Sequence, residues 1–97
     1  MKNIQFSWDE NKAKSNLAKH KVSFDEAKTV FDDDNARLIY DPDHNEDEDR
    51  FILLGLSCKL KVLTVVHCYK ESDNNIRIIS ARKSTKNEEK QYKEFLL

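Results

Sequence analysis

Basic and hydroxyl side chains are crowded together near the C-terminus, between a predicted strand at 76–81 and a predicted helix. Arg82 and Lys83 follow the strand directly, and Ser84 and Thr85 come next. The first backbone amides of a helix have no intrahelical partner and carry the positive end of its dipole. Arginine adds a planar two-pronged donor and lysine adds a compact charge, and both bind phosphate. The junction is therefore a candidate phosphate-binding site.

The helix after this junction carries a basic stripe. Lys86, Lys90 and Lys93 recur at helical spacing, while Glu88 and Tyr92 lie on the other side, towards the sheet. The stripe could extend a phosphate-binding surface, although a solvated helix face is the simpler explanation for any single lysine. Thr85 and Glu88 are spaced as a capping box, which explains Glu88 better than catalysis does.

A histidine and an arginine interrupt the two preceding predicted strands. His67 lies within 62–69 and Arg77 within 76–81. Because side chains alternate along a strand, even pairing of the two strands brings these residues to one face of the sheet, and odd pairing separates them. Together they would place a titratable group beside a phosphate clamp. A lone strand histidine, by contrast, is more often structural.

These residue types suit cleavage of an RNA phosphodiester bond without a metal ion. In that reaction the neighbouring 2′-hydroxyl attacks the phosphorus. The protein must activate the hydroxyl, neutralise the phosphorane and protonate the leaving oxygen. Arginine and lysine can neutralise the phosphorane, and His67, Lys83 or Tyr92 could supply the proton transfers. A phosphate-binding module with no chemistry fits the same residues.

Length and composition indicate one domain spanning 1–97. Hydrophobic residues make up 38% of the chain and charged residues 36%, which allows a single modest core. The sequence has neither an apolar run of membrane-spanning length nor a signal-peptide core, so we expect a cytoplasmic protein with no membrane partner. Cys58 and Cys68 are expected to be reduced and partly buried. No cofactor or metal site is predicted.

Charge is distributed unevenly along the chain. Residues 32–49 hold nine acidic residues against Arg37 alone, a net charge of −8, and because the whole chain carries −1 the rest carries +7. This asymmetry suggests a basic face and an acidic loop edge. A solvated loop beside ordinary lysine-rich helices would give the same totals.

Periodicity predicts an α+β domain in the order strand, two helices, four strands, helix. Asp9 and Ser23 are expected to cap the two N-terminal helices, and Pro42 is expected to end a strand before a polar loop at 43–49. The predicted strands are 2–7, 36–40, 50–56, 62–69 and 76–81, with turns near 59–61 and at 71–75. A mainly antiparallel sheet with helices packed against it is the expected architecture.

The sequence resembles the BrnT family of bacterial type II toxins, small ribonucleases with a RelE-like fold. Four motifs in order carry the resemblance: FSWDENKAKSNLAKHKVSFDEAKTVF (6–31), DPDHNEDEDRFILLG (41–55), VVH (65–67) and IRIISARKSTKNEEKQY (76–92). It implies a RelE-like α+β fold, with a mainly antiparallel sheet, two N-terminal helices and a C-terminal helix.

The resemblance also implies a function and partners. The expected protein cleaves RNA and halts translation until a ribbon-helix-helix antitoxin of the BrnA kind neutralises it, and it meets operator DNA mainly through that antitoxin. The basic C-terminal motif of the family falls on Arg77, Ser80, Arg82 and Lys83. The alternative is a non-catalytic, partner-binding protein that acts with an antitoxin in control of their operon.

Residues and resemblance together give two sets of candidate site residues. Those assigned to catalysis are His67, Arg77, Arg82, Lys83 and Tyr92. Those assigned to RNA binding are Lys12, Lys19, Ser80, Lys86, Lys90 and Lys93.

Overall fold

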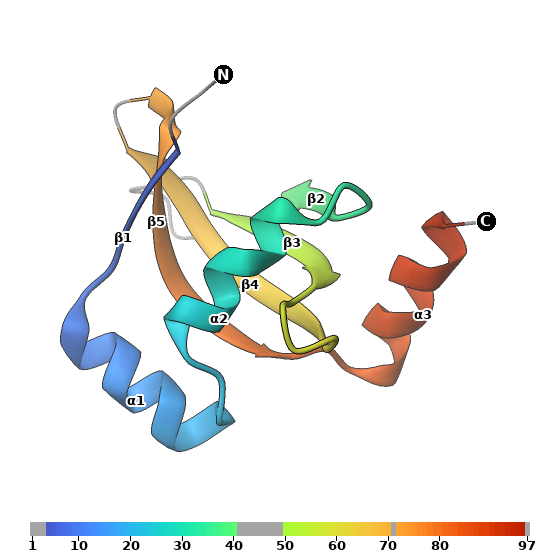
Figure 1. Cartoon of the computed structure of the whole chain (residues 1–97), viewed down its shortest axis with the longest axis horizontal. Coiled ribbons are helices and arrows are strands. Elements are labelled where there is room, and N and C mark those ends of the chain that lie inside the picture. Colours follow the sequence, from blue (N-terminus) through green and yellow to red (C-terminus); the bar gives the residue numbers. More distant parts are fainter. Residues whose placement is uncertain (1–3, 41–49, 71, 97) are drawn as a thin grey trace.

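Helices lie on both sides of a curved sheet in the computed structural model, which describes residues 4–40, 50–70 and 72–96 (Figure 1). In chain order the elements are β1 (Gln5–Ser7), α1 (Glu10–His20), α2 (Phe24–Thr29), the 3₁₀ helix η1 (Val30–Asp32), β2 (Arg37–Tyr40), β3 (Phe51–Leu56), β4 (Val62–Lys70), β5 (Ser72–Lys83) and α3 (Lys86–Phe95). This confirms the predicted α+β order, with η1 added as a short continuation of α2.

The sheet has the strand order β1-β5-β4-β3-β2. Strands β2 to β5 pair in antiparallel fashion with their neighbours, and β1 runs parallel to β5. The mainly antiparallel sheet is thus confirmed. The hairpin turn expected near 59–61 joins β3 to β4, and Leu60 occupies a left-handed conformation there with φ of 62°.

The helices α1 and α2, together with η1, cover one face of the sheet (Figure 1). Buried residues of α2 and η1 pack there against buried residues of β3, β4 and β5: Phe24, Ala27 and Val30 against Leu53, Leu63, Val65, Ile78 and Ala81. Gly55 permits this close packing, because a Cβ at that position would lie 2.7 Å from Val30 Cγ1. Burial of these apolar groups is the main stabilising contribution on this face.

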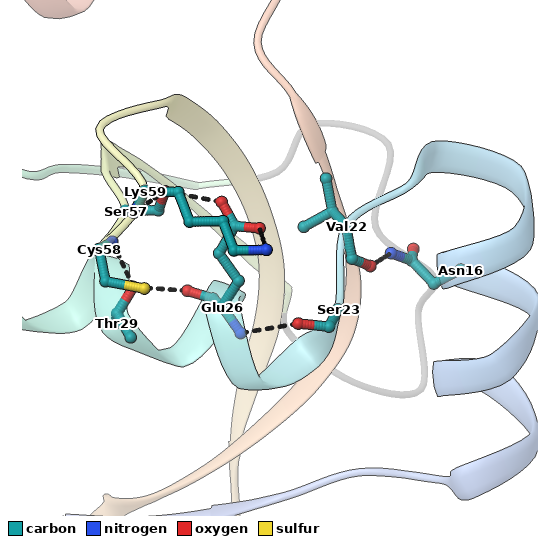
Figure 2. A network of polar contacts seen from close by, with 8 residues as sticks. All are labelled: Asn16, Val22, Ser23, Glu26, Thr29, Ser57, Cys58 and Lys59. Carbon is teal, nitrogen blue, oxygen red and sulfur yellow. Dashed lines mark hydrogen bonds and ion pairs between the residues drawn. The ribbon is translucent and has the colours of Figure 1, made fainter.

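Side-chain caps start the N-terminal helices as predicted. Asp9 accepts from the amides of Asn11 and Lys12, and Ser23 Oγ accepts from the amide of Glu26 at 3.0 Å. The Glu26 carboxylate is buried and accepts at 2.7 Å from Ser57 Oγ, which lies in the β3–β4 connection (Figure 2). A buried carboxylate needs such a partner, and the pair ties α2 to the turn.

Two local predictions are corrected by the structure. The polar segment expected to be a turn at 71–75 is mostly strand, because β5 begins at Ser72, which pairs with Lys70. Cys58, expected to be partly buried in a strand, is exposed in the turn after β3, whereas Cys68 is buried. Neither cysteine forms a disulfide within the described residues. The predictions for Pro42 and for the 43–49 loop lie outside the described residues.

An asparagine side chain takes the place of a neighbouring strand along part of β5. Among the described strands, β1 pairs with β5 only from Asn75 to Arg77. Further along, Asn16 Nδ2 of α1 donates to Ala81 O at 2.8 Å and Asn16 Oδ1 accepts from Ala81 N at 3.1 Å. The same Nδ2 donates to Val22 O at 2.9 Å. The buried Asn16 amide therefore fixes α1 against β5.

None of the helices in the described part of the chain has both the length and the apolar character needed to cross a bilayer.

Candidate functional site

A bulge in β5 determines which way its basic side chains point. Three residues of β5 lie opposite three alternate residues of β4: Arg77 opposite Cys68, Ser80 opposite Val66, and Arg82 opposite Thr64. Alternate residues of a strand share a face, so Arg77, Ser80 and Arg82 share one too. Ile79 is the extra residue, and without it Arg77 would point to the opposite face. We call this surface the Arg77–Arg82 face.

Arg82 is held by a carboxylate of α3. Its Nη1 and Nη2 lie 2.7 and 3.0 Å from Glu88 Oε1 and Oε2, a two-pronged geometry that a phosphate could also adopt. The predicted capping box between Thr85 and Glu88 is present. The hydrogen bond from Arg82 lowers the pKa of Glu88 to about 2 despite partial burial, and the same bond raises the pKa of Arg82. The arginine thus has an internal partner in the site.

Arg77 lies half-buried on the same face. Within the ranges that the structure describes, no residue forms a hydrogen bond or ion pair with its guanidinium. About 15 Å of strand separates its Cα from that of Arg82. The two arginines can therefore contact different groups of an extended ligand.

His67 points to the opposite face of the sheet, because it pairs with Ile78. Of the two registers open to sequence reasoning, the structure has the one that separates His67 from Arg77. The ring is fully buried, with centroid distances of 4.9 Å to Phe31 and 5.3 Å to Tyr69. Burial lowers the pKa of His67 to about 4. The imidazole is therefore neutral at physiological pH.

The hydroxyl of Tyr92 is occupied by a structural contact. It donates to Asp33 Oδ2 at 2.6 Å, and that oxygen also accepts from the amide of Leu56 at 2.9 Å. Burial, followed by the Asp33 carboxylate, raises the pKa of Tyr92 to about 12. Burial would raise the pKa of Asp33, but the hydrogen bonds from Tyr92 and from two backbone amides outweigh it and lower that pKa. This contact fastens α3 to the segment between η1 and β2 and to β3.

The basic residues assigned to the junction and to α3 are divided between different surfaces. Lys86, Lys90 and Lys93 line one hollow on α3 together with Glu89 and Glu94. Lys83 is exposed but lies opposite Leu63, so it points to the face away from Arg82. On α3, Lys93 lies 3.1 Å from Glu89 and Lys90 lies 4.0 Å from Glu94. Three predicted RNA-binding residues, by contrast, meet at one groove between α1 and β5: Lys12, Lys19 and Ser80.

Some residues of the site were not found by sequence reasoning. Thr64 lies 3.1 Å from Glu88 Oε1 and 2.8 Å from Ser84 Oγ, both through its hydroxyl. Asp33 is one acid in a run of three, with no local signal that marks it as the partner of Tyr92. Among the described residues, His, Cys, Asp and Glu side chains form no group of three or more that could hold a metal ion.

The comparisons with known proteins bear on this arrangement. A family model described as "Ribonuclease toxin, BrnT, of type II toxin-antitoxin system" matches residues 8–88. The chain belongs to the BrnT family. The match includes Arg77, Ser80, Arg82 and Glu88, and it ends before Tyr92. A search of curated proteins finds no match.

A solved structure supports the BrnT fold. The crystal structure of the Brucella abortus ribonuclease toxin BrnT is similar to this chain with a TM-score of 0.63. The two sequences are 21% identical, and the similarity covers 86% of this chain and 99% of that chain. The resemblance inferred from the four motifs is confirmed. As a BrnT ribonuclease toxin of a type II system, the chain is expected to have a protein antitoxin as its partner.

Proposed function

We propose that this BrnT-family chain is a metal-independent endoribonuclease that cleaves RNA in the cytoplasm and thereby inhibits translation. Its antitoxin is of the ribbon-helix-helix, BrnA-like kind, and operator DNA is reached through that antitoxin. The observation that carries the proposal is the joint presence of Arg77, Ser80 and Arg82 on one face of β5, with a carboxylate beside Arg82.

The Arg77–Arg82 face suits an RNA strand because its cations are spaced along β5. Arg82 would bind the phosphate that is cleaved, and Arg77 would bind a phosphate farther along the strand. Ser80, which lies between them, offers a hydroxyl for hydrogen bonding. Such forked donors stabilise the charge that develops on phosphorane oxygens.

Glu88 is our candidate for the general base. A phosphate that enters the site competes with Glu88 for the Arg82 fork, and release from Arg82 removes the main cause of the low pKa of Glu88. The carboxylate can then accept the 2′-hydroxyl proton as that oxygen attacks the phosphorus. The bond from phosphorus to the 5′ oxygen breaks, this oxygen takes a proton from solvent, and a 2′,3′-cyclic phosphate remains.

Cleavage of RNA by the purified protein in the presence of EDTA tests the proposal. We expect fragments with 2′,3′-cyclic phosphate ends, and we expect Arg82→Ala to cut at least about 100-fold more slowly, as loss of a transition-state donor does elsewhere. A thermal melt checks that the variant is folded. Wild-type cleavage that disappears with EDTA, or a folded Arg82→Ala protein with full activity, would refute the mechanism.

One observation favours the alternative of a non-catalytic, antitoxin-binding protein. Arg82 is satisfied internally by Glu88, and the Tyr92 hydroxyl and the His67 ring are held in structural contacts. A growth assay distinguishes the ribonuclease from the non-catalytic, antitoxin-binding protein. Expression of the chain without its antitoxin arrests cells if it is a ribonuclease, and leaves growth unchanged if it only binds its partner.

A further inference from the structure

A polar groove lies between α1 and β5, beyond the point where β1 stops pairing with β5. Its volume is about 340 Å³. Ser15, Lys12, Lys19 and His20 of α1 contribute to one wall, and Ile79 and Ser80 of β5 contribute to the other. The bulge residue Ile79 thus belongs to this groove, and its neighbour Ser80 lines the groove as well as the Arg77–Arg82 face.

The two lysines of the groove are available for a ligand. Lys12 and Lys19 are exposed, and they lie two helical turns apart, about 10 Å along α1. In the described part of the chain neither forms an ion pair, unlike Lys90 and Lys93 of α3. Asp9 also lines the groove, but its carboxylate accepts the first amides of α1.

The groove has a fixed shape and is continuous with the proposed RNA face. Asn16 ties α1 to Ala81 through two hydrogen bonds, so the walls cannot separate without breaking them. Ser80 belongs to both surfaces, since it lies on the Arg77–Arg82 face and also lines the groove. An RNA strand bound at Ser80 can therefore pass over the edge of β5 and continue between α1 and β5.

We propose that this groove is a second RNA subsite, which binds the phosphates of a segment flanking the cleaved bond. The inference rests on the proposed ribonuclease function and adds a length requirement to it. An RNA of a few nucleotides occupies only the Arg77–Arg82 face, whereas a longer one also contacts Lys12 and Lys19. RNA is favoured over an acidic peptide because the groove continues the face that binds phosphate.

The test compares short and long RNA on one pair of variants. The probes are labelled 2′-O-methyl oligoribonucleotides of about 3 and about 12 residues, which lack the attacking hydroxyl, and fluorescence anisotropy gives their Kd values. Removing two phosphate contacts to single-stranded RNA should weaken binding roughly 25-fold at 0.1 M salt and flatten the slope of log K against log salt by about 1.4. Lys12→Ala with Lys19→Ala should show this loss for the long probe and none for the short one.

A matched control removes the same charge elsewhere. Lys14→Ala with Lys28→Ala changes two exposed lysines, one on another side of α1 and one on α2, and should leave both probes unaffected. Alanine is a good helix former, so all four substitutions preserve the helices. Unchanged binding of the long probe by the groove variant, or equal losses in groove variant and control, would overturn the subsite.

Two further results separate this inference from the proposed function. If the wild type binds the long probe through the groove but cleaves no ordinary RNA, the ribonuclease mechanism fails and the groove remains. If it cleaves RNA and the groove variant binds both probes normally, only the subsite fails. Loss of binding to a polyglutamate peptide, with normal binding of both RNA probes, would assign the groove to a protein partner instead.

Discussion

Arg82 can be satisfied either by the carboxylate of Glu88 or by a phosphate, but its single fork cannot serve both in full. The free protein has the carboxylate in place. In the proposed mechanism, the contact keeps the arginine in one orientation before substrate arrives, and it keeps Glu88 close to the position that the phosphate would occupy. The RNA phosphate must therefore compete with Glu88, because its binding to Arg82 displaces a charge-assisted hydrogen bond.

Replacing Glu88 by Gln separates its capping role from its proposed role as general base. Glutamine also completes a capping box, so the start of α3 should be preserved, while the general base is lost. We expect single-turnover cleavage to fall about 100-fold or more, and RNA binding to stay equal or tighten because Arg82 is held less strongly. Glu89→Gln is the control, because this neighbour forms an ion pair with Lys93 rather than with Arg82. A Glu88→Gln protein that cleaves at the wild-type rate would leave Glu88 with the capping role alone.

His67 makes stability depend on pH. Its pKa of about 4 in the folded protein lies below the ordinary value of 6.5, so the unfolded chain takes up the proton first. Stability is therefore complete above about pH 6.5 and is lost as pH falls towards 4. Between pH 7 and 5 the loss should be on the order of 2 kcal/mol.

Urea titrations of wild type and His67→Leu at the two pH values measure this effect. The variant should be less stable overall, but its free energy of unfolding should change little between pH 7 and 5. Equal pH dependence in the two proteins would show that another group is responsible. Glu88 does not interfere, because the stability it contributes is lost only as pH falls from about 4.5 to about 2.

The residue types in the sequence were enough to locate the basic motif. The directions in which its side chains point could be known only from the structure. Arg77 and Arg82 share a face only because Ile79 is an extra residue in the pairing of β5 with β4. No local feature of a strand with three isoleucines indicates such a bulge. The separation of His67 from Arg77 depends on the parity of one pairing register. The environment of Tyr92 depends on Asp33, a contact 59 residues distant in sequence.

At the scale of elements, α3 is held by polar contacts at two of its turns. Glu88 contacts Arg82 near the start, and Tyr92 contacts Asp33 about one turn later. Tyr92→Phe keeps the buried ring and removes the hydroxyl. Because the acceptor is a charged carboxylate, we expect the free energy of unfolding to fall by about 2 kcal/mol.

The same variant tests whether Tyr92 takes part in the chemistry. If its hydroxyl only fastens α3, Tyr92→Phe cleaves RNA at nearly the wild-type rate, and amide hydrogen exchange speeds up in α3 more than in β4. Wild-type exchange together with loss of cleavage would restore the catalytic role that the sequence suggested. Thermal melting on the same sample gives the change in stability.

The order of helices and strands could be predicted from the sequence because helix caps and hydrophobic periodicity are local features of the chain. Asp9, Ser23 and Thr85 mark three helix starts, and each is confirmed by a side-chain hydrogen bond. The start of β5 was misjudged because Ser, Asp and Asn at 72–75 favour turns. Pairing with β4 and with β1 overrides that preference, and such long-range partners are not encoded in the segment itself.

At the scale of the whole molecule, charge is less segregated than the sequence totals suggest. Asp33 belongs to the acidic segment 32–49, yet its carboxylate serves Tyr92 and the amide of Leu56 inside the fold. On α3, Glu89 and Glu94 offset two of the three lysines. If the antitoxin presents an acidic segment, Arg77 and the lysines beside α1 offer it cations that have no ion-pair partner among the described residues.

The Asn16 amide has a consequence for how copies of the chain behave towards one another. Past Arg77, the outer edge of β5 is a strand edge at which another chain could add a strand, and such edges promote aggregation. By binding both backbone groups of Ala81, Asn16 blocks that edge from within the monomer. Asn16→Leu should therefore increase self-association relative to the wild type, as sedimentation over a concentration series would show. Asn11→Leu, an exposed change on the same helix, should sediment as the wild type does. An Asn16→Leu protein that also sediments as the wild type does would mean that the edge is protected by other means.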